Sequence, residues 1–191
     1  MSRISKNDIE LWLDQGILWP KKTIDISGEI TQELSQSVIK RLYLLDSSRL
    51  DQKITILLNS EGGDTTQGLA IYDAIKNCQS HVEVIVNGEC YSVAAWILQA
   101  ADTRLMMPNS KMMIHVGEFE LPSNHPGNQK AWLDDWKSDE KVFNKILLDK
   151  IHQVHPEWTA YNIGELIQFD TILTPIGAVE LGLADDVLDG E

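Results

Sequence analysis

Short apolar runs alternate with longer amphipathic segments along most of this chain. The runs 53–59 and 81–88 are rich in β-branched residues and predict strands, the first of them covered on both faces. The segments 31–46 and 65–78 place apolar residues at helical spacing, and each starts at or directly after a residue suited to cap a helix. This alternation predicts an α/β fold with a parallel sheet and right-handed crossovers.

The same alternation continues beyond residue 90. Residues from Ser92 onward are small and apolar and predict a helix, and two short strands are expected around the turn "PNS". The elements expected in this part of the chain are strands at 103–107 and 111–115, a helix at 159–168, a β-like segment at 171–175, a helix at about 176–181 and a closing segment at 182–188.

A long helix is predicted over roughly 128–155, after the irregular segment 117–127. Much of its circumference is polar. Its apolar stripe consists of Trp132, Trp136, Phe143, Ile146, Leu147, Ile151 and Val154. This stripe could pack on the helix's own domain, or it could project and be buried against a second copy of the chain.

Length and charge narrow the class of protein. With 191 residues, of which 43% are hydrophobic, we expect one domain over 1–191. The net charge of −13 and the lack of a basic cluster exclude a nucleic-acid binder that neutralises phosphates.

The N-terminus has no signal-peptide pattern and no segment is long enough to span a membrane, so we expect a cytoplasmic protein. Cys78 and Cys90 form neither a disulfide framework nor a zinc-type pair.

The stretch "VNGECYSVAAW" contains the first candidate for chemistry, Ser92. A strand is expected to stop at a bend at Gly88, and Ser92 follows at the start of a helix. A serine in this position is most simply a helix N-cap. It is also where a nucleophile would have its oxyanion stabilised by N–H groups of the first turn, including that of Val93. The pattern leaves both hypotheses open.

The partners that a serine nucleophile needs can be sought elsewhere in the chain. His115 ends a predicted strand at the edge of the sheet, where functional groups of open α/β folds gather. Asp170 is one of 29 acidic residues, and no local pattern distinguishes it. In "LLNSEGGD", Gly63 follows a strand and is either part of a tight turn or a second N–H donor beside a peptide substrate.

Three segments together resemble the proteolytic subunit of the Clp protease family, and the resemblance covers about residues 22–188. They are "LLNSEGGDTTQGLAIYDAI", "VNGECYSVAAWILQAADTRLMMPNSKMMIH" and "DTILTPIGAVELGLADDV". The chain departs from the family in having Glu61 where Ser-Pro-Gly-Gly is usual, and in having "VGEFELPSNHPG" in place of a glycine-rich strand after the histidine. These departures resemble atypical and phage-encoded members.

The resemblance implies a Clp/crotonase-like spiral of β-α units and a serine endopeptidase that cleaves unfolded polypeptides. By this resemblance Ser92 is the nucleophile, His115 the general base and Asp170 its orienting partner, with the N–H groups of Gly63 and Val93 as the oxyanion hole. It implies a head at about 22–116 and 156–188 and a handle at about 117–155. It also implies a homo-oligomeric chamber of one or two rings, with heptamers expected, an AAA+ unfoldase as partner, and no cofactor or metal.

Three alternatives remain beside this hypothesis. The chain could be a non-catalytic, ring-forming paralogue or a phage head-maturation protease of the same fold. A crotonase-like enzyme would use the same pair of N–H groups for an acyl thioester. The sequence shows no basic residues arranged for a coenzyme A diphosphate, which disfavours the last alternative.

Overall fold

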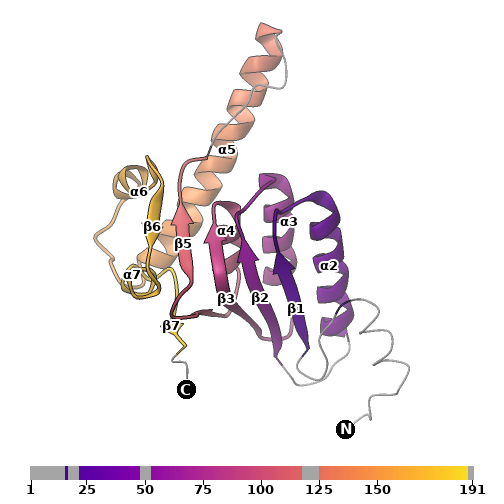
Figure 1. The fold of residues 1–191 in the computed structure, drawn as a ribbon. Helices are drawn as coiled ribbons and strands as arrows, with labels where there is room; N and C mark the ends of the chain where they lie inside the picture. The colour runs from indigo at the N-terminus through magenta and orange to yellow at the C-terminus, as the bar shows by residue number, and fades with distance from the viewer. Residues whose placement is uncertain (1–15, 17–21, 48–52, 118–124, 189–191) are drawn as a thin grey trace.

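The computed structural model describes residue 16 and the ranges 22–47, 53–117 and 125–188. In chain order the elements are β1 (Thr23–Ser27), α2 (Gln32–Ser47), β2 (Ile54–Ser60), α3 (Thr65–Lys76), β3 (Val82–Tyr91), α4 (Val93–Gln99), β4 (Thr103–Met106), β5 (Lys111–Ile114), α5 (Pro126–Ile151), α6 (Ala160–Ile167), β6 (Thr171–Leu173), α7 (Pro175–Glu180) and β7 (Asp186–Val187). The α/β fold and the parallel sheet expected from the sequence are confirmed (Figure 1).

The sheet is built around the ten-residue strand β3. β1, β2 and β3 are parallel neighbours in that order. On its free side β3 pairs first with β4, through Glu83–Val86, and then with β5, through Glu89–Tyr91. β4 in turn pairs with β7, whereas β5 pairs antiparallel with β6. The sheet therefore divides beyond β3 into two short continuations, of which the β5–β6 continuation leads to the candidate site.

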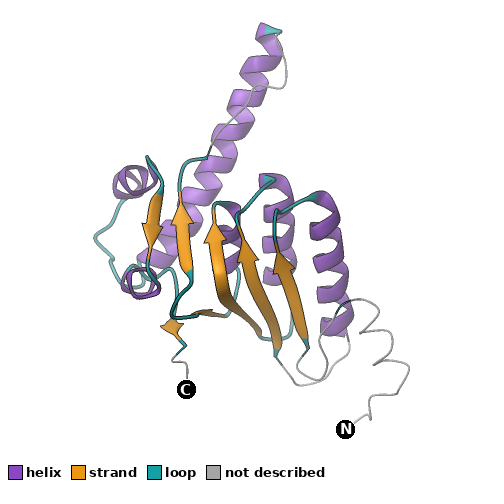
Figure 2. Ribbon diagram, in the orientation of Figure 1, coloured by secondary structure: helices purple, strands orange, loops and turns teal. Residues whose placement is uncertain are grey.

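The helices α2, α3 and α4 lie on one face of the sheet (Figure 2). The prediction that the 53–59 strand is covered on both faces therefore holds only in part. Ile54, Ile56 and Leu58 on one face of β2 are fully buried. On the other face Thr55 is buried, Leu57 is only partly buried and Asn59 is exposed. The physical reason is the strand order. Because β1 to β4 are added in one direction by right-handed crossovers, every crossover helix falls on the same side.

The expected bend at Gly88 is also absent. Gly88 lies inside β3, which continues to Tyr91, three residues beyond it. The glycine leaves room for a side chain of the neighbouring strand, since a Cβ at this position would approach Oδ1 of Asn59 to 2.2 Å. Asn59 in turn accepts a hydrogen bond of 2.8 Å from the backbone N–H of Glu89, where the β2–β3 register shifts. The strand therefore carries the chain without interruption to Ser92.

Several expected helix caps are present. Oγ1 of Thr31 accepts a hydrogen bond of 3.3 Å from the N–H of Leu34, and Oδ1 of Asp64 accepts one of 3.0 Å from Gln67. These bonds satisfy N–H groups that a helix start leaves without an internal partner. The helices α2 and α3 therefore begin close to where the periodicity of the sequence predicted helix starts.

The long helix α5 runs from Pro126 to Ile151. The predicted range 128–155 therefore began too late and ended four residues too far along the chain. Of the segment expected to be irregular, residues 118–124 lie outside the described ranges. Phe143, Leu147 and Ile151 are buried against the head, and the other end of α5 extends well beyond the sheet (Figure 1). Near that end, Trp132 is 45% exposed. The head and handle boundaries remain a prediction.

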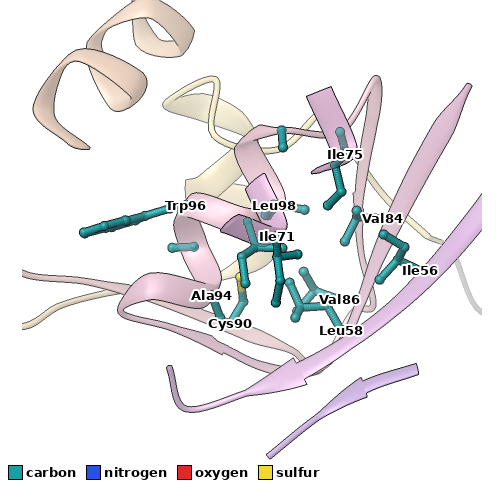
Figure 3. Packing of buried hydrophobic residues seen from close by; sticks show 14 of the residues in the cluster. Ile56, Leu58, Ile71, Ile75, Val84, Val86, Cys90, Ala94, Trp96 and Leu98 are labelled. Carbon is teal, nitrogen blue, oxygen red and sulfur yellow. The ribbon is translucent and has the colours of Figure 1, made fainter. Parts of the chain in front are cut away.

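The core lies between the sheet and its helical layer. It combines the inward side chains of β2 and β3 with those of α3 and α4, among them Ile56, Val84, Ile71 and Leu98 (Figure 3). Trp96 also belongs to α4, but its ring extends away from the labelled aliphatic residues (Figure 3). Among the described residues, no helix combines the length and apolar character needed to cross a bilayer.

Candidate active site

Ser92 occupies the junction between β3 and α4. Its N–H donates to the carbonyl of Met113 at 2.9 Å and its carbonyl accepts from Ala95 at 2.9 Å. Its backbone has φ of 53° and ψ of −125°, a conformation that side-chain-bearing residues rarely adopt. Ser92 stands at the N-cap position of α4, as the first hypothesis expected, but its side chain makes no capping hydrogen bond with that helix. The turn instead holds the hydroxyl free for another partner.

That partner is His115, the residue directly after β5. Its Nε2 lies 2.9 Å from Oγ of Ser92. The parallel register pairs Tyr91 with Met113, so the residues that follow these two strands emerge side by side. The side chain of His115 is 21% exposed, which leaves the imidazole partly accessible from solvent. In this geometry an unprotonated Nε2 can accept the proton of the Ser92 hydroxyl.

Asp170 approaches the other side of the imidazole. The antiparallel β5–β6 ladder pairs Met113 with Ile172 and Ile114 with Thr171, so the next step places Asp170 opposite His115. Oδ1 of Asp170 lies 3.3 Å from Nδ1 of His115. The carboxylate is 69% exposed. Ser92, His115 and Asp170, which are far apart in sequence, therefore converge at the ends of three neighbouring strands.

The Gly62–Gly63 pair fits a narrow space between Ile30 and Ser92. A Cβ on Gly62 would lie 2.7 Å from Cβ of Ser92 and 2.8 Å from the carbonyl oxygen of Tyr91. A Cβ on Gly63 would lie 2.6 Å from the carbonyl oxygen of Ile30. Both glycines also have positive φ, of 100° and 146°. Neither position admits a side chain, so the two glycines are more than a flexible turn.

This packing orients the N–H of Gly63. The residues on either side of Gly63 form backbone hydrogen bonds with Ile30. The N–H of Ile30 donates to the carbonyl of Gly62 at 2.7 Å, and the carbonyl of Ile30 accepts from the N–H of Asp64 at 2.9 Å. In such a parallel bridge the central residue turns its own N–H and C=O to the opposite side. Within the described parts of the chain, no acceptor lies in hydrogen-bond distance of the N–H of Gly63 or of Val93, the first residue of α4.

A cavity of about 350 Å³ opens beside these groups. Gly63, Ser92, Val93 and His115 contribute to its wall, so the hydroxyl and both N–H-bearing residues border one space. Part of the wall comes from α5. A substrate group in this cavity would meet the hydroxyl, the imidazole and the N–H-bearing backbone together.

The arrangement suits acyl transfer to a serine hydroxyl. A thiol nucleophile does not fit, because Cys90 is fully buried and burial raises the pKa of its thiol far above neutrality. Cys78 is distant from this cavity, and burial, with repulsion from Asp46 and Asp102, raises the pKa of its thiol to about 11. In the described ranges, no group of three or more His, Cys, Asp or Glu side chains could hold a metal ion.

Several residues of the cavity wall were not singled out from the sequence, and three of them bear on its chemistry. Trp96 belongs to α4, and Asp139 and Glu140 belong to α5. A signal for the two acids was present: they interrupt the apolar stripe of the long helix between Trp136 and Phe143. That interruption falls where the helix passes the candidate site.

Comparisons with known proteins point to one family. The family model for Clp protease matches residues 10–191. The chloroplastic ATP-dependent Clp protease proteolytic subunit 3 of Arabidopsis thaliana is 32% identical over 175 residues, which are 91% of this chain and 55% of that protein. This chain therefore spans about half the length of that relative.

Two further matches extend over most of both chains. The ATP-dependent Clp protease proteolytic subunit of Deinococcus radiodurans is 28% identical over 170 residues, covering 88% of this chain and 80% of that protein. A solved ClpP1 mutant from Listeria monocytogenes is 26% identical, with a TM-score of 0.78 over 95% of this chain and 96% of that chain. The fold is therefore the Clp/crotonase-like fold expected from the motifs.

Proposed function

The chain belongs to the Clp protease family, and we propose that it is a serine endopeptidase that cleaves unfolded polypeptides by way of an acyl-enzyme. The observation that carries this proposal is the 2.9 Å contact between Nε2 of His115 and Oγ of Ser92. It is supported by the ion-pair contact of Asp170 with the opposite ring nitrogen. A structural cap would need neither contact.

The proposed reaction has two halves. His115 accepts the proton of Ser92 as Oγ attacks the substrate carbonyl, and it then delivers that proton to the departing amine. A water molecule next attacks the ester, with His115 accepting its proton and returning one to Oγ as the acid product leaves. Asp170 keeps Nδ1 protonated and stabilises the imidazolium in both halves.

The negative oxygen formed in each half requires donors that are already in place. The N–H groups of Gly63 and Val93 are suited to this role because both border the cavity and neither is used within the described structure. Fixed donors of this kind typically contribute roughly 10²–10³ each to the rate. The residue that replaces the family's usual proline, Glu61, is exposed and precedes the two glycines with positive φ.

We further infer that the peptidase works as a ring-shaped homo-oligomer supplied by a Clp-type ATPase. The names of its relatives, ATP-dependent Clp protease proteolytic subunits, support the ATPase partner. The exposed apolar side chains of α5 support self-association, because Trp132, Leu133 and Val142 are 45%, 38% and 44% exposed on a helix that extends beyond the head. A closed chamber would restrict access to a site that otherwise has an open cavity. Heptameric rings are the expected form.

Active-site labelling tests the proposed function. A fluorophosphonate probe should label the wild-type protein, and Ser92→Ala and His115→Ala should each abolish labelling. Ser27→Ala, which removes an exposed hydroxyl outside the site, should label like the wild type. Mass spectrometry of the labelled peptide locates the adduct. A folded, assembled protein that never reacts would indicate a non-catalytic ring subunit and overturn the proposal.

A further inference from the structure

The cavity beside Ser92 is lined partly by acidic and aromatic side chains. When a peptide is attacked at a carbonyl carbon, the side chain of that same residue must lie close to the nucleophile. The reason is that the Cα atom, which carries the side chain, is bonded directly to the carbonyl carbon. The cavity borders Ser92 directly, so this side chain would enter it. The groups that α5 contributes to the wall then determine which side chains fit best.

That wall carries two carboxylates. Trp136, Asp139, Glu140 and Phe143 are spaced i, i+3, i+4 and i+7 along α5, so they lie on one face of the helix, and all four line the cavity. Phe143 is the first of them to be fully buried against the head. In the described ranges, no Lys, Arg or His lies within ion-pair distance of Asp139 or Glu140. Their charge is therefore uncompensated within the cavity.

Two indole rings border the same space. Trp96 stacks on Phe143 with ring centroids 4.2 Å apart, and Trp136 lies one helical turn before Asp139 and Glu140. Trp96 is only 8% exposed, yet its Nε1–H has no hydrogen-bond acceptor among the described residues. This buried donor thus lacks the acceptor that such groups normally have. Aromatic faces beside carboxylates are suited to a cation.

We propose that this cavity selects a lysine or arginine side chain at the substrate residue whose carbonyl is attacked. The selectivity rests on the proposed peptidase function, whereas the affinity of the cavity for a cation does not. Asp139 and Glu140 neutralise the positive group, and the indole rings contact its planar or methylene part. Acidic side chains at the same substrate position are repelled, and aliphatic ones leave both carboxylates without a partner.

A small fluorescent cation tests the cavity without any catalysis. We expect 4-aminobenzamidine to bind saturably to both the wild type and Ser92→Ala, at least about tenfold more tightly than 4-aminobenzamide, its neutral analogue of the same shape. Equal binding of the two compounds, or no saturable binding of the amidine, would overturn the proposal. This comparison needs no change to the cavity wall.

Two matched double variants locate the binding. Asp139→Asn with Glu140→Gln should weaken amidine binding at least about tenfold, because both carboxylates are neutralised. Asp134→Asn with Asp149→Asn changes the net charge by the same amount on the same helix. Those two carboxylates form i,i+4 ion pairs with Lys130 and Lys145 outside the cavity, and amidine binding should be retained. An equal loss in both double variants would show a non-specific charge effect and contradict the assignment.

Substrates then separate this proposal from the proposed function. Internally quenched peptides that differ only in Arg, Lys, Leu or Glu at the cleaved position should show at least about tenfold higher kcat/KM for Arg and Lys than for Leu. Product sequencing confirms the cleaved bond. An active enzyme that prefers Leu would overturn the selectivity and leave the peptidase intact. A protein that binds the amidine but resists the fluorophosphonate would overturn the peptidase alone.

Discussion

Gly68 of α3 lies directly against Val93 of α4: a Cβ on Gly68 would approach Cγ2 of Val93 to 2.0 Å. Val93 is buried, and it is the residue whose N–H follows the candidate nucleophile. The close packing of α3 against α4 therefore determines where the first turn of α4, with the N–H of Val93, lies relative to the Gly62–Gly63 loop. A glycine in the middle of a helix usually lowers stability, but here the absence of a side chain allows the two helices to pack closely.

The first prediction concerns this contact. Gly68→Ala should lower the free energy of unfolding by about 1–2 kcal/mol, because the overlap outweighs the roughly 1 kcal/mol that alanine gains in a helix. It should also slow fluorophosphonate labelling by moving Val93. Gly164→Ala is the matched control: Gly164 lies in α6 with open space around it, so alanine should stabilise the protein slightly. Denaturant unfolding and labelling rates measure both effects, and equal stability of the two variants would contradict the account.

The second prediction concerns the backbone of Ser92. A non-glycine residue at φ of 53° and ψ of −125° carries strain on the order of 1–3 kcal/mol. Ser92→Gly and Ser92→Ala both remove the hydroxyl, but only glycine relieves the strain. We expect Ser92→Gly to be more stable than Ser92→Ala by about 1 kcal/mol after the entropy cost of glycine. Chemical denaturation of the two variants measures the difference, and a less stable glycine variant would refute the strain.

The third prediction concerns the pH dependence of stability. Burial disfavours the ionised form of Asp185, but hydrogen bonds from the side chain and backbone of Arg104, with its positive charge, hold the pKa of Asp185 below its ordinary value. Arg104 is 4% exposed and also donates to Gln99 and to the carbonyl of Gly182. A lowered pKa in the folded state means that the stabilisation is present above the pKa of the unfolded chain. It is lost as the pH falls through the folded-state pKa.

Asp185→Asn should therefore destabilise the protein at neutral pH by about 2 kcal/mol, a value reduced from that of a fully buried pair because the Asp185 side chain is 38% exposed. The gap from the wild type should narrow on acidification. Asp186→Asn, at the exposed neighbouring residue, serves as the control. Urea unfolding at several pH values measures both variants. A gap that widens in acid would contradict the sign.

The fourth prediction concerns assembly. Trp132→Ala combined with Val142→Ser should reduce the mass of the oligomer, because both side chains are about half exposed on α5 and would be available to a neighbouring subunit. Lys145→Ala, on the same helix, should leave the mass unchanged. Native mass spectrometry and sedimentation measure the result. A variant that keeps the wild-type mass would place the contact elsewhere.

Local sequence patterns were sufficient for the parallel strands and for most of the helices. The alternating valines of β3 and the cap at Asp64 specify their elements with little help from distant residues. The errors arose where a distant contact decides. Gly88 looks like a bend in the sequence, but it lies inside a strand, where the side chain of Asn59 from the neighbouring strand occupies the space of a Cβ.

The candidate site shows the same limit. Ser92 and His115 could be nominated because each stands at the end of a strand, but nothing in the sequence around Asp170 favours it over the other acidic residues. Its position depends on the register of the β5–β6 ladder, which is set by pairing between segments more than 50 residues apart. Likewise, the stripe on the long helix does not reveal that Phe143 is buried in its own head while Trp132 is exposed.

The ladder that brings Asp170 beside His115 makes the spacing of the site largely independent of how the chain travels between them. Neighbouring strands are held about 4.7–4.9 Å apart by their backbone hydrogen bonds, whatever connects them. The excursion from β5 through the long helix to β6 could thus be shortened, lengthened or replaced in evolution, or by protein engineers, while the reacting groups keep their separation. A one-residue slip of β6 would have the opposite effect, because it would turn the carboxylate to the far side of the sheet.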